Sequence, residues 1–272
     1  MASTGFDHDI VFVGGLHRSG TSLIADMISR SPGASRLEGT GVPEDEGQHL
    51  QRVFPRAVLH GGAGRFAFSA VMRLDESSPL CTPESAQSLL DSWRPYWDLE
   101  SRVLVEKSPP NLLKGPFLQG LFPRSAFVMV MRHPIAVAEA TRKWARTASN
   151  TDLIRHWVTA YEIMAEDLPK LRRAVVVRYE DLVEHPDREL ARILRLVGLP
   201  AAPVAEAVHG QINQKYYGAW LSGGALSRWD RDRAARRLGR RVERFGYGLS
   251  EPYVRGPLPE EFSGLNATRP PR

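Results

Sequence analysis

The stretch of sequence that decides the fold runs from residue 10 to residue 28 and reads IVFVGGLHRSGTSLIADMI. Its first four residues are β-branched or aromatic, and an amphipathic helical pattern starts directly after the glycine-containing turn. Glycines allow the backbone to turn tightly, and the N–H groups and dipole at a helix start attract an anion. The stretch therefore predicts a strand, a turn and a helix that can cradle a phosphate-like group. The alternative is a plain connecting turn with an exposed arginine.

Three further apolar runs, at residues 103–105, 126–131 and 174–177, are continuous rather than alternating. This pattern is typical of parallel strands that are covered on both faces. Helical stripes lie between them, one over residues 50–58 and another ending near Gly198. Alternating strands and helices indicate the α/β class. We expect a P-loop-like, three-layer fold with a central, mainly parallel sheet flanked by helices and a helical C-terminal part.

The 272 residues are enough for one large domain, which we place at residues 1–249, followed by a Pro-rich, extended tail at residues 250–272. No apolar stretch approaches the ~20 residues of a membrane-spanning helix, and the start carries no secretory signal pattern, so no membrane contact is expected. The single cysteine, Cys81, cannot form an internal disulfide, which fits a cytoplasmic location. The net charge of +5 favours an anionic partner.

The turn after the first strand resembles a nucleotide P-loop, but with one important difference. Gly15, Gly20 and Ser22 match the P-loop pattern, whereas Thr21 stands where the phosphate-binding lysine should be. The strand at residues 126–131 ends in Arg132, where a P-loop kinase would carry a metal-holding acid. Arginine side chains rather than a magnesium ion are therefore predicted to neutralise the ligand, and no metal is expected.

Four motifs, in the same order, resemble those of the sulfotransferases that use 3′-phosphoadenosine-5′-phosphosulfate (PAPS), in particular the bacterial and tyrosylprotein-sulfotransferase-like branch. They are GLHRSGTSL (15–23), VEKSP (105–109), RHP (132–134) and VRYEDL (177–182). The resemblance implies PAPS as the donor, with Arg18, Ser19, Gly20, Thr21 and Ser22 in the 5′-phosphosulfate loop. It implies further that Lys107 faces the transferred group, that Arg132 binds the 3′-phosphate and that Tyr179 packs near the adenine.

The family's 3′-phosphate motif usually places a serine eight residues after the arginine, where this chain has Ala140. The adjacent Thr141 can supply the missing hydroxyl if the helix is shifted slightly. Two C-terminal residues, Lys215 and Arg228, are further candidates for cofactor contacts, and a loop and a solvated helix face are their respective alternatives. Arg228 is also the first of eight arginines between residues 228 and 244. A solvent-exposed helix face best explains this run of charges. No motif that reads nucleic acid accompanies it, so no nucleic-acid partner is expected.

An acceptor hydroxyl needs a base, and three candidates lie close together in the sequence. Glu46 stands at helical spacing from Leu50, which suggests that it faces inward, and His49 lies beside the same stripe. Glu38 is nearest to the position of the glutamate base in the tyrosylprotein branch. A first helical turn after Pro43 explains the acids without any catalysis. The sequence leaves all three open.

Together these features predict transfer of a sulfuryl group from PAPS to a hydroxyl acceptor, which can be a small metabolite, a carbohydrate or a peptide. The alternatives are a P-loop-type kinase and a non-catalytic protein that binds nucleotide or nucleic acid. Residues 38–98 are expected to build the acceptor pocket. The aromatic residues of that region are expected either to line the pocket or to form core: Phe66, Phe68, Trp93, Tyr96 and Trp97.

Overall fold

A six-stranded sheet, in the order β2-β3-β1-β4-β5-β6, forms the centre of the computed structural model, which describes residues 7–201, 203, 213–252 and 255–267. Its strands are β1 (Asp9–Gly15), β2 (Ala34–Arg36), β3 (Val103–Lys107), β4 (Ala126–Met131), β5 (Arg173–Arg178) and β6 (Leu265–Ala267). The first five pair in parallel, and β6 pairs antiparallel with β5. Strands β1, β3, β4 and β5 are buried along their whole length, as the continuous apolar runs predict.

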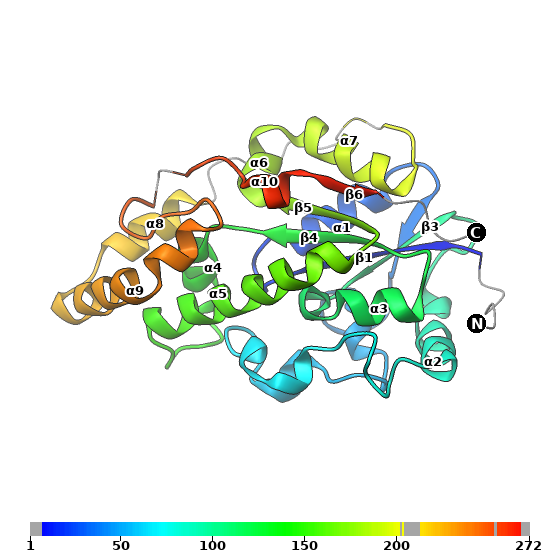
Figure 1. Cartoon of the computed structure of the whole chain (residues 1–272), viewed down its shortest axis with the longest axis horizontal. Coiled ribbons are helices and arrows are strands. Elements are labelled where there is room, and N and C mark those ends of the chain that lie inside the picture. Colours follow the sequence, from blue (N-terminus) through cyan, green and yellow to red (C-terminus); the bar gives the residue numbers. More distant parts are fainter. Residues whose placement is uncertain (1–6, 202, 204–212, 253–254, 268–272) are drawn as a thin grey trace.

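Helices cover both faces of this sheet (Figure 1). They are α1 (Thr21–Ser29), α2 (Pro83–Trp93), α3 (Gly115–Leu121), α4 (Pro134–Thr141), α5 (Asn150–Asp167), α6 (Tyr179–Glu184), α7 (Pro186–Val197), α8 (Gln214–Leu221), α9 (Ala225–Glu243) and α10 (Glu260–Ser263). Helix α7 ends at Gly198, which has the positive φ of 67° that a left-handed C-terminal cap requires. The predicted α/β, three-layer architecture is confirmed.

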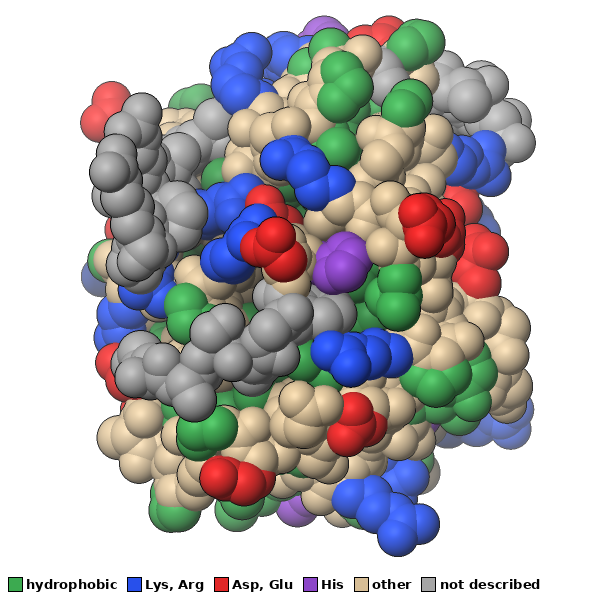
Figure 2. All heavy atoms as spheres, turned by 90° about the vertical axis from the view of Figure 1, so that its right-hand side faces the viewer, with side chains coloured by type: hydrophobic (Ala, Val, Ile, Leu, Met, Phe, Trp, Pro, Cys, Tyr) green, Lys and Arg blue, Asp and Glu red, His purple; other side chains and the backbone are tan. Residues whose placement is uncertain are grey.

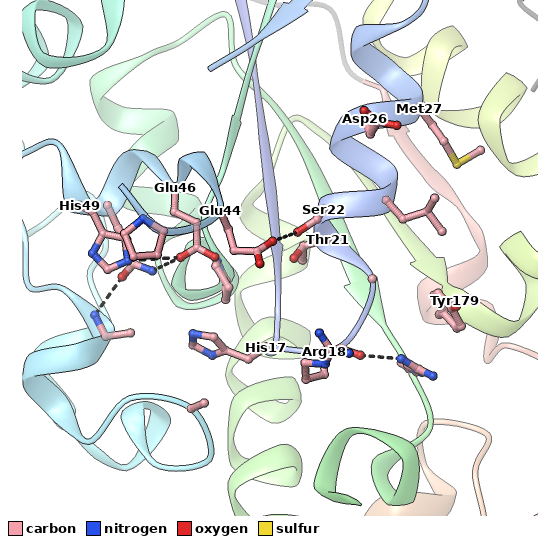
Figure 3. A pocket seen from close by; sticks show the side chains of 18 of the residues that line it. His17, Arg18, Thr21, Ser22, Asp26, Met27, Glu44, Glu46, His49 and Tyr179 are labelled. Carbon is pink, nitrogen blue, oxygen red and sulfur yellow. Dashed lines mark hydrogen bonds and ion pairs between the residues drawn. The ribbon is translucent and has the colours of Figure 1, made fainter. Parts of the chain in front are cut away.

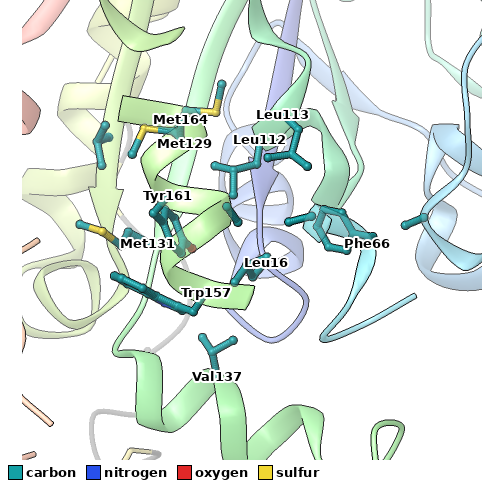
Figure 4. Close-up of a cluster of buried hydrophobic side chains, with 14 of the residues drawn as sticks. Leu16, Phe66, Leu112, Leu113, Met129, Met131, Val137, Trp157, Tyr161 and Met164 are labelled. Atoms are coloured by element: carbon teal, nitrogen blue, oxygen red, sulfur yellow. The ribbon is translucent and has the colours of Figure 1, made fainter. Parts of the chain in front are cut away.

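Two hydrophobic cores lie on opposite faces of the sheet because successive side chains of a strand point in opposite directions. Phe12 joins the core beneath α2, α3 and α5, whereas Val11 and Val13 join the core beneath α1 and α7. Figure 4 shows part of the first core, where Trp157 and Tyr161 of α5 pack over β4. Their polar atoms are hydrogen-bonded: Trp157 Nε1 donates to the carbonyl of Arg132 at 2.9 Å, and the Tyr161 hydroxyl donates to the carbonyl of Val130 at 2.7 Å. Helix α5 is therefore hydrogen-bonded to the carboxyl-terminal end of β4.

The segment between β2 and α2 differs from the sequence prediction. A helix was expected over residues 50–58, but the chain forms short 3-10 helices instead, namely η1 (Pro43–Asp45), η2 (Gly47–His49) and η3 (Ala57–His60). Pro55 cannot donate a helical hydrogen bond. In addition, the Gln51 side chain accepts hydrogen bonds from the backbone of Val53 and Phe54, and so replaces a helical turn.

The C-terminal part also departs from the expected extended tail. Phe262 of α10 is buried against the first core, and β6 adds an edge strand to the sheet. Helix α9 packs along α5, and Asp230 accepts hydrogen bonds from the backbone N–H groups of Asn150 and Thr151 at the start of α5. The basic helix is thus partly a structural support for α5.

The face at the amino-terminal ends of the strands is seen in Figure 2, where basic and acidic side chains are interspersed. On this edge Arg124 pairs with Asp7 and Asp9, and Arg173 reaches Asp9 at 3.4 Å. Local ion pairs therefore neutralise the charges at the amino-terminal ends of the strands.

Candidate active site

A cavity of about 970 Å³ opens at the carboxyl-terminal ends of the parallel strands, where ligands bind in open α/β sheets. Its lining comes from the β1–α1 turn, from η1 to η3, and from the residues that follow β4 and β5. The lining includes His17, Arg18, Gly20, Thr21, Ser22, Glu44, Glu46, His49, Arg132 and Tyr179. Figure 3 shows Glu46 and His49 on one side of the turn residues His17 and Arg18, with Tyr179 on the other.

The β1–α1 turn has the backbone conformation of an anion cradle. Gly20 has a φ of 106°, and a Cβ atom added to it would lie 2.5 Å from the Tyr179 ring. Arg18 also adopts a positive φ, of 70°, and left-handed residues in a turn are typical of backbone nests that bind anions. Only glycine fits at position 20, both because of its φ and because Tyr179 packs directly against it.

Arg132 joins the three elements that surround this cradle. Its guanidinium donates to the carbonyl of Arg18 at 2.8 Å and to Asn213 Oδ1 at 2.9 Å, and it lies 4.3 Å from the centre of the Tyr179 ring. Asn213 also donates to Glu180 Oε1 at 2.7 Å. Arg132 is only 4% exposed, and these contacts hold its guanidinium in one position at the edge of the cavity.

Glu46 and His49 face the cradle from the opposite wall, and Lys107 supports them from behind. Lys107 Nζ donates to Glu46 Oε1 at 3.2 Å and to the carbonyl of Glu44 at 2.9 Å. Gln48 Nε2 donates to the other oxygen, Glu46 Oε2, at 2.5 Å, and His49 Nε2 lies 3.7 Å from the same atom. Burial lowers the pKa of His49, although the neighbouring Glu46 acts in the opposite direction. The imidazole is therefore neutral at pH 7 and able to accept a proton.

A buried carboxylate fixes this wall to the sheet. Glu106, only 1% exposed, accepts hydrogen bonds from the backbone N–H of Gly47 at 3.0 Å, from Ser108 Oγ at 2.6 Å and from Asn111 Nδ2 at 2.5 Å. Ser108 Oγ in turn accepts from the backbone N–H of Gln48 at 3.0 Å. Burial raises the pKa of Glu106. The turn that carries the candidate bases is thus attached to the end of β3.

The structure does not bring every predicted residue to the cavity. Glu38 is exposed and pairs with Arg36 at 3.1 Å. Thr141 is buried at the end of α4, Lys215 lies beside the Tyr216 ring, and Arg228 is exposed on α9; none of them lines the cavity. Ser19 is fully buried beneath the turn, so only Arg18, Gly20, Thr21 and Ser22 of the loop are lining residues.

The aromatic residues expected near the acceptor are mostly core. Phe66 and Trp93 have no exposed surface, and Trp97 is 6% exposed, whereas Phe68 is partly exposed without lining the cavity. Small residues form the cavity wall in this region instead, namely Ala57, Val58, Gly61, Gly62 and Ala63. Nothing in their sequence pattern pointed to that role.

His17 was not among the predicted site residues, yet it lines the cavity between the cradle and the opposite wall. Burial, with smaller contributions from the charges of Lys107 and His49, lowers its pKa to about 4. Its position directly before Arg18 in the cradle was the only available signal. Within the described residues, no cluster of three or more His, Cys, Asp or Glu side chains is arranged to hold a metal ion. Over the same residues, no helix combines the length and the apolar character needed to span a membrane.

Comparisons with known proteins identify the family. A model of the sulfotransferase family matches residues 10–203. The chain belongs to the sulfotransferase family. The match includes all four sequence motifs and both walls of the cavity, and it confirms the expected relationship.

The curated relatives are distant. Protein-tyrosine sulfotransferase 2 of Gallus gallus is 26% identical over 206 residues, covering 70% of this chain and 51% of the relative. Nodulation protein NoeE of Sinorhizobium fredii is 24% identical over 229 residues, covering 73% of this chain and 52% of the relative. This chain therefore spans about half the length of the curated relatives that it matches.

Solved structures agree on the fold of this family member. The sulfotransferase domain of the Synechococcus PCC 7002 olefin synthase gives a TM-score of 0.53 at 20% identity, covering 91% of this chain and 98% of that one. Sulfotransferase STF1 of Mycobacterium tuberculosis also gives 0.53, at 15% identity, covering 84% of this chain and 76% of that one. At these identities the likeness concerns the fold alone.

Proposed function

We propose that this sulfotransferase-family chain transfers a sulfuryl group from PAPS to a hydroxyl acceptor, without a metal ion and without a covalent enzyme intermediate. The observation that carries the proposal is the pairing of two walls across one cavity. An anion cradle with Arg18 and Arg132 faces a carboxylate and a neutral imidazole, Glu46 and His49. A protein that only binds nucleotides has no need of the second wall.

The residues present fit the donor. The cradle, with its Gly20 backbone and the start of α1, suits the 5′-phosphosulfate, and Arg18 supplies a positive charge beside it. The buried Arg132 suits the 3′-phosphate, and Tyr179 presents an aromatic face for the adenine. Thr141, Lys215 and Arg228 lie outside the cavity lining, so contacts from them are not part of this proposal.

When bound, PAPS supplies a sulfuryl group that passes to the acceptor oxygen as the bond to the 5′-phosphate breaks. Cations and N–H donors beside the bridging oxygen stabilise the charge that grows there. We assign this task to Lys107 and the amides of the turn. In the present conformation Lys107 lies behind Glu44 and Glu46 and is 5% exposed, so it must shift toward the cavity to take part.

For the base we favour His49, held by Glu46, over Glu46 alone. Both oxygens of Glu46 already accept hydrogen bonds within the protein, from Lys107 and Gln48, so they are engaged by donors other than an acceptor hydroxyl. A carboxylate beside an imidazole orients it and stabilises the cation that forms when the imidazole takes a proton. Glu38 ranks last because it is paired with Arg36 outside the cavity lining. A cytoplasmic location, which the single Cys81 suggests, completes the proposal.

Thermal shift tests the donor assignment. The desulfated donor, 3′-phosphoadenosine-5′-phosphate, should stabilise the protein, whereas ATP with magnesium and NAD should not. Arg18→Ala should remove most of the shift. Stabilisation by ATP with magnesium alone, together with ATP turnover, would instead support a kinase.

Transfer itself is tested with radiolabelled PAPS and three acceptors: a phenol, an amino sugar and a tyrosine peptide. The variants Glu46→Gln, His49→Gln and Glu38→Gln are compared at saturating PAPS. We expect His49→Gln to lose the most rate with its PAPS affinity intact, Glu46→Gln to lose less, and Glu38→Gln to behave like the unaltered protein. A full rate in His49→Gln would exclude it as the base.

A further inference from the structure

An acidic side chain lies at the first turn of α1, next to the anion cradle. Ser22 Oγ, in the first turn of α1, donates a hydrogen bond to the Glu44 carboxylate at 3.2 Å. Both residues line the cavity, and the dashed line in Figure 3 marks their contact. Ser22 matches the P-loop position whose hydroxyl serves a phosphate or its metal ion. Glu44 therefore presents a negative charge where the charge of a donor is expected.

The turn that carries Glu44 is strained. Glu44 and Asp45 adopt φ angles of 55° and 49°, in the left-handed region, which aspartate tolerates but glutamate rarely visits. The conformation of Glu44 is therefore unfavourable and persists only when surrounding contacts hold it. Here Thr40 supplies the contacts, since its Oγ1 and N–H donate to Asp45 Oδ1 at 2.5 Å and 3.0 Å.

The same turn holds Lys107 away from the cavity. The carbonyl of Glu44 accepts a hydrogen bond from Lys107 Nζ at 2.9 Å, and Lys107 does not line the cavity. The two contacts of Glu44, one through its side chain and one through its backbone, thus join the cradle to the candidate catalytic lysine. A movement of this one residue changes both.

From these contacts we infer that Glu44 is a built-in competitor for the donor. Its carboxylate bonds Ser22 when the cradle holds no anion, and a phosphosulfate or phosphate group displaces it, which relaxes the strained turn and breaks one of the two hydrogen bonds that hold Lys107, the one to the Glu44 carbonyl. This inference rests on the proposed function, because it assumes that the cradle binds such a group. It assigns to Glu44 a role in setting donor affinity, and it explains how Lys107 is kept behind the wall until the donor arrives.

Calorimetric binding of 3′-phosphoadenosine-5′-phosphate tests the competition. Glu44→Gln keeps the size of the side chain but removes its charge, and we expect it to bind roughly three- to tenfold more tightly than the unaltered protein. Glu44→Asp, which keeps the charge, should gain less. In a Ser22→Ala background the gain from Glu44→Gln should shrink, because the carboxylate has lost its hydrogen-bond donor there.

Asp26→Asn is the matched control for a general charge effect. Asp26 also lines the cavity, but its carboxylate pairs with Arg30 at 2.9 Å and with Arg36 at 3.6 Å rather than with the cradle. We expect its affinity to change less than that of Glu44→Gln. Equal gains in the two variants, or weaker binding by Glu44→Gln, would overturn the inference.

Hydrogen exchange then follows the displacement directly. On addition of 3′-phosphoadenosine-5′-phosphate, amides at residues 16–22 should become protected, whereas those at residues 44–46 should exchange faster. No protection at residues 16–22 would count against the proposed function itself. Protection at residues 16–22 with unchanged or slower exchange at residues 44–46 would leave the function standing and overturn the role of Glu44.

Discussion

The two walls of the cavity are built in different ways. The cradle wall is made by a turn between two regular elements, β1 and α1, whose backbone presents the binding groups. The opposite wall, residues 42–63, consists of short 3-10 helices, and buried side chains such as Glu106, Gln48 and Gln51 hold it in place. The first wall is a turn between regular elements that Arg132 and Tyr179 support from β4 and β5, whereas the second is irregular and is fixed by the side chains of Glu106 and Ser108, about sixty residues away.

Because the two walls are built differently, substitutions far from the cavity should affect them differently. A backbone cradle loses affinity when its own charges are removed. A wall held by a polar network loses geometry when a buried partner is removed, even one that touches no substrate. The following predictions separate these two kinds of effect.

The largest effect is expected at Lys107, which donates hydrogen bonds to Glu44 and Glu46 of the second wall. Lys107→Met should slow sulfuryl transfer by ~10²-fold or more, because the cation that stabilises the leaving oxygen is lost. Single-turnover rates at saturating PAPS measure this. Lys114→Met is the control, since Lys114 is also buried but donates to the carbonyl of Pro110 rather than to Glu44 and Glu46, and burial lowers its pKa to about 7. Comparable losses in both variants would mean that burial, not chemistry, explains the effect.

Removing the charge at the edge of the cradle should weaken binding next most strongly. Arg132→Ala is expected to reduce the affinity for 3′-phosphoadenosine-5′-phosphate by about 10- to 100-fold, as measured by calorimetry. Arg173 is a matched buried arginine on β5, paired with Asp9 at the other edge of the sheet. Arg173→Ala should lower stability and leave the affinity unchanged. If Arg132→Ala bound as tightly as the unaltered protein, the cradle would not extend to β4.

The polar network behind the second wall gives a smaller, selective effect. Glu106→Gln places an amide N–H₂ against the Asn111 donor, so the turn with Glu46 and His49 should loosen and turnover should fall about tenfold. Affinity for the desulfated donor should stay the same, which a general loss of folding would not allow. The control is Glu189→Gln, a buried glutamate paired with Arg188 and Arg192 on α7. Turnover lost equally in the control would contradict a positioning role for Glu106.

The smallest effect concerns the pH dependence of stability. Burial lowers the pKa of His17 to about 4 and those of His133 and His156 to about 3. The unfolded chain therefore binds more protons below pH ~6.5, and the stability of the fold, complete above that pH, falls as the pH drops toward 3. Each histidine should contribute about 1 kcal/mol of loss between pH 6 and pH 5.

Denaturant midpoints at pH 7, 6 and 5 measure that slope. His156→Gln should flatten it, since glutamine can accept the Ala67 N–H that His156 Nε2 accepts at 3.2 Å without becoming charged. His185 is exposed and serves as the comparison, and His185→Gln should keep the original slope. An unchanged slope in His156→Gln would show that this imidazole is not buried and neutral.

Much of the fold was predictable because its signals are local. Continuous apolar runs identified β1, β3, β4 and β5, and the cap at Gly198 was recognised from the residue type alone. The wall at residues 42–63 was not, since its helical spacing around Leu50 suggested a helix that Pro55 and the buried Gln51 prevent. The role of Glu106 could not be predicted from the sequence either, because it arises from its contact with Gly47, which is distant in the sequence.

The residues from 10 to 28 were enough to predict the first strand, the turn and the following helix, and short apolar runs were enough for β3, β4 and β5, because each of these elements depends on residues within a few positions of one another. Folding in three dimensions established which acids face the cavity, that His17 joins them, that Arg132 reaches the β1–α1 turn, and that Glu44 bonds Ser22. Those outcomes depend on burial and on hydrogen bonds between segments that fold together, for which no short stretch of sequence carries the information.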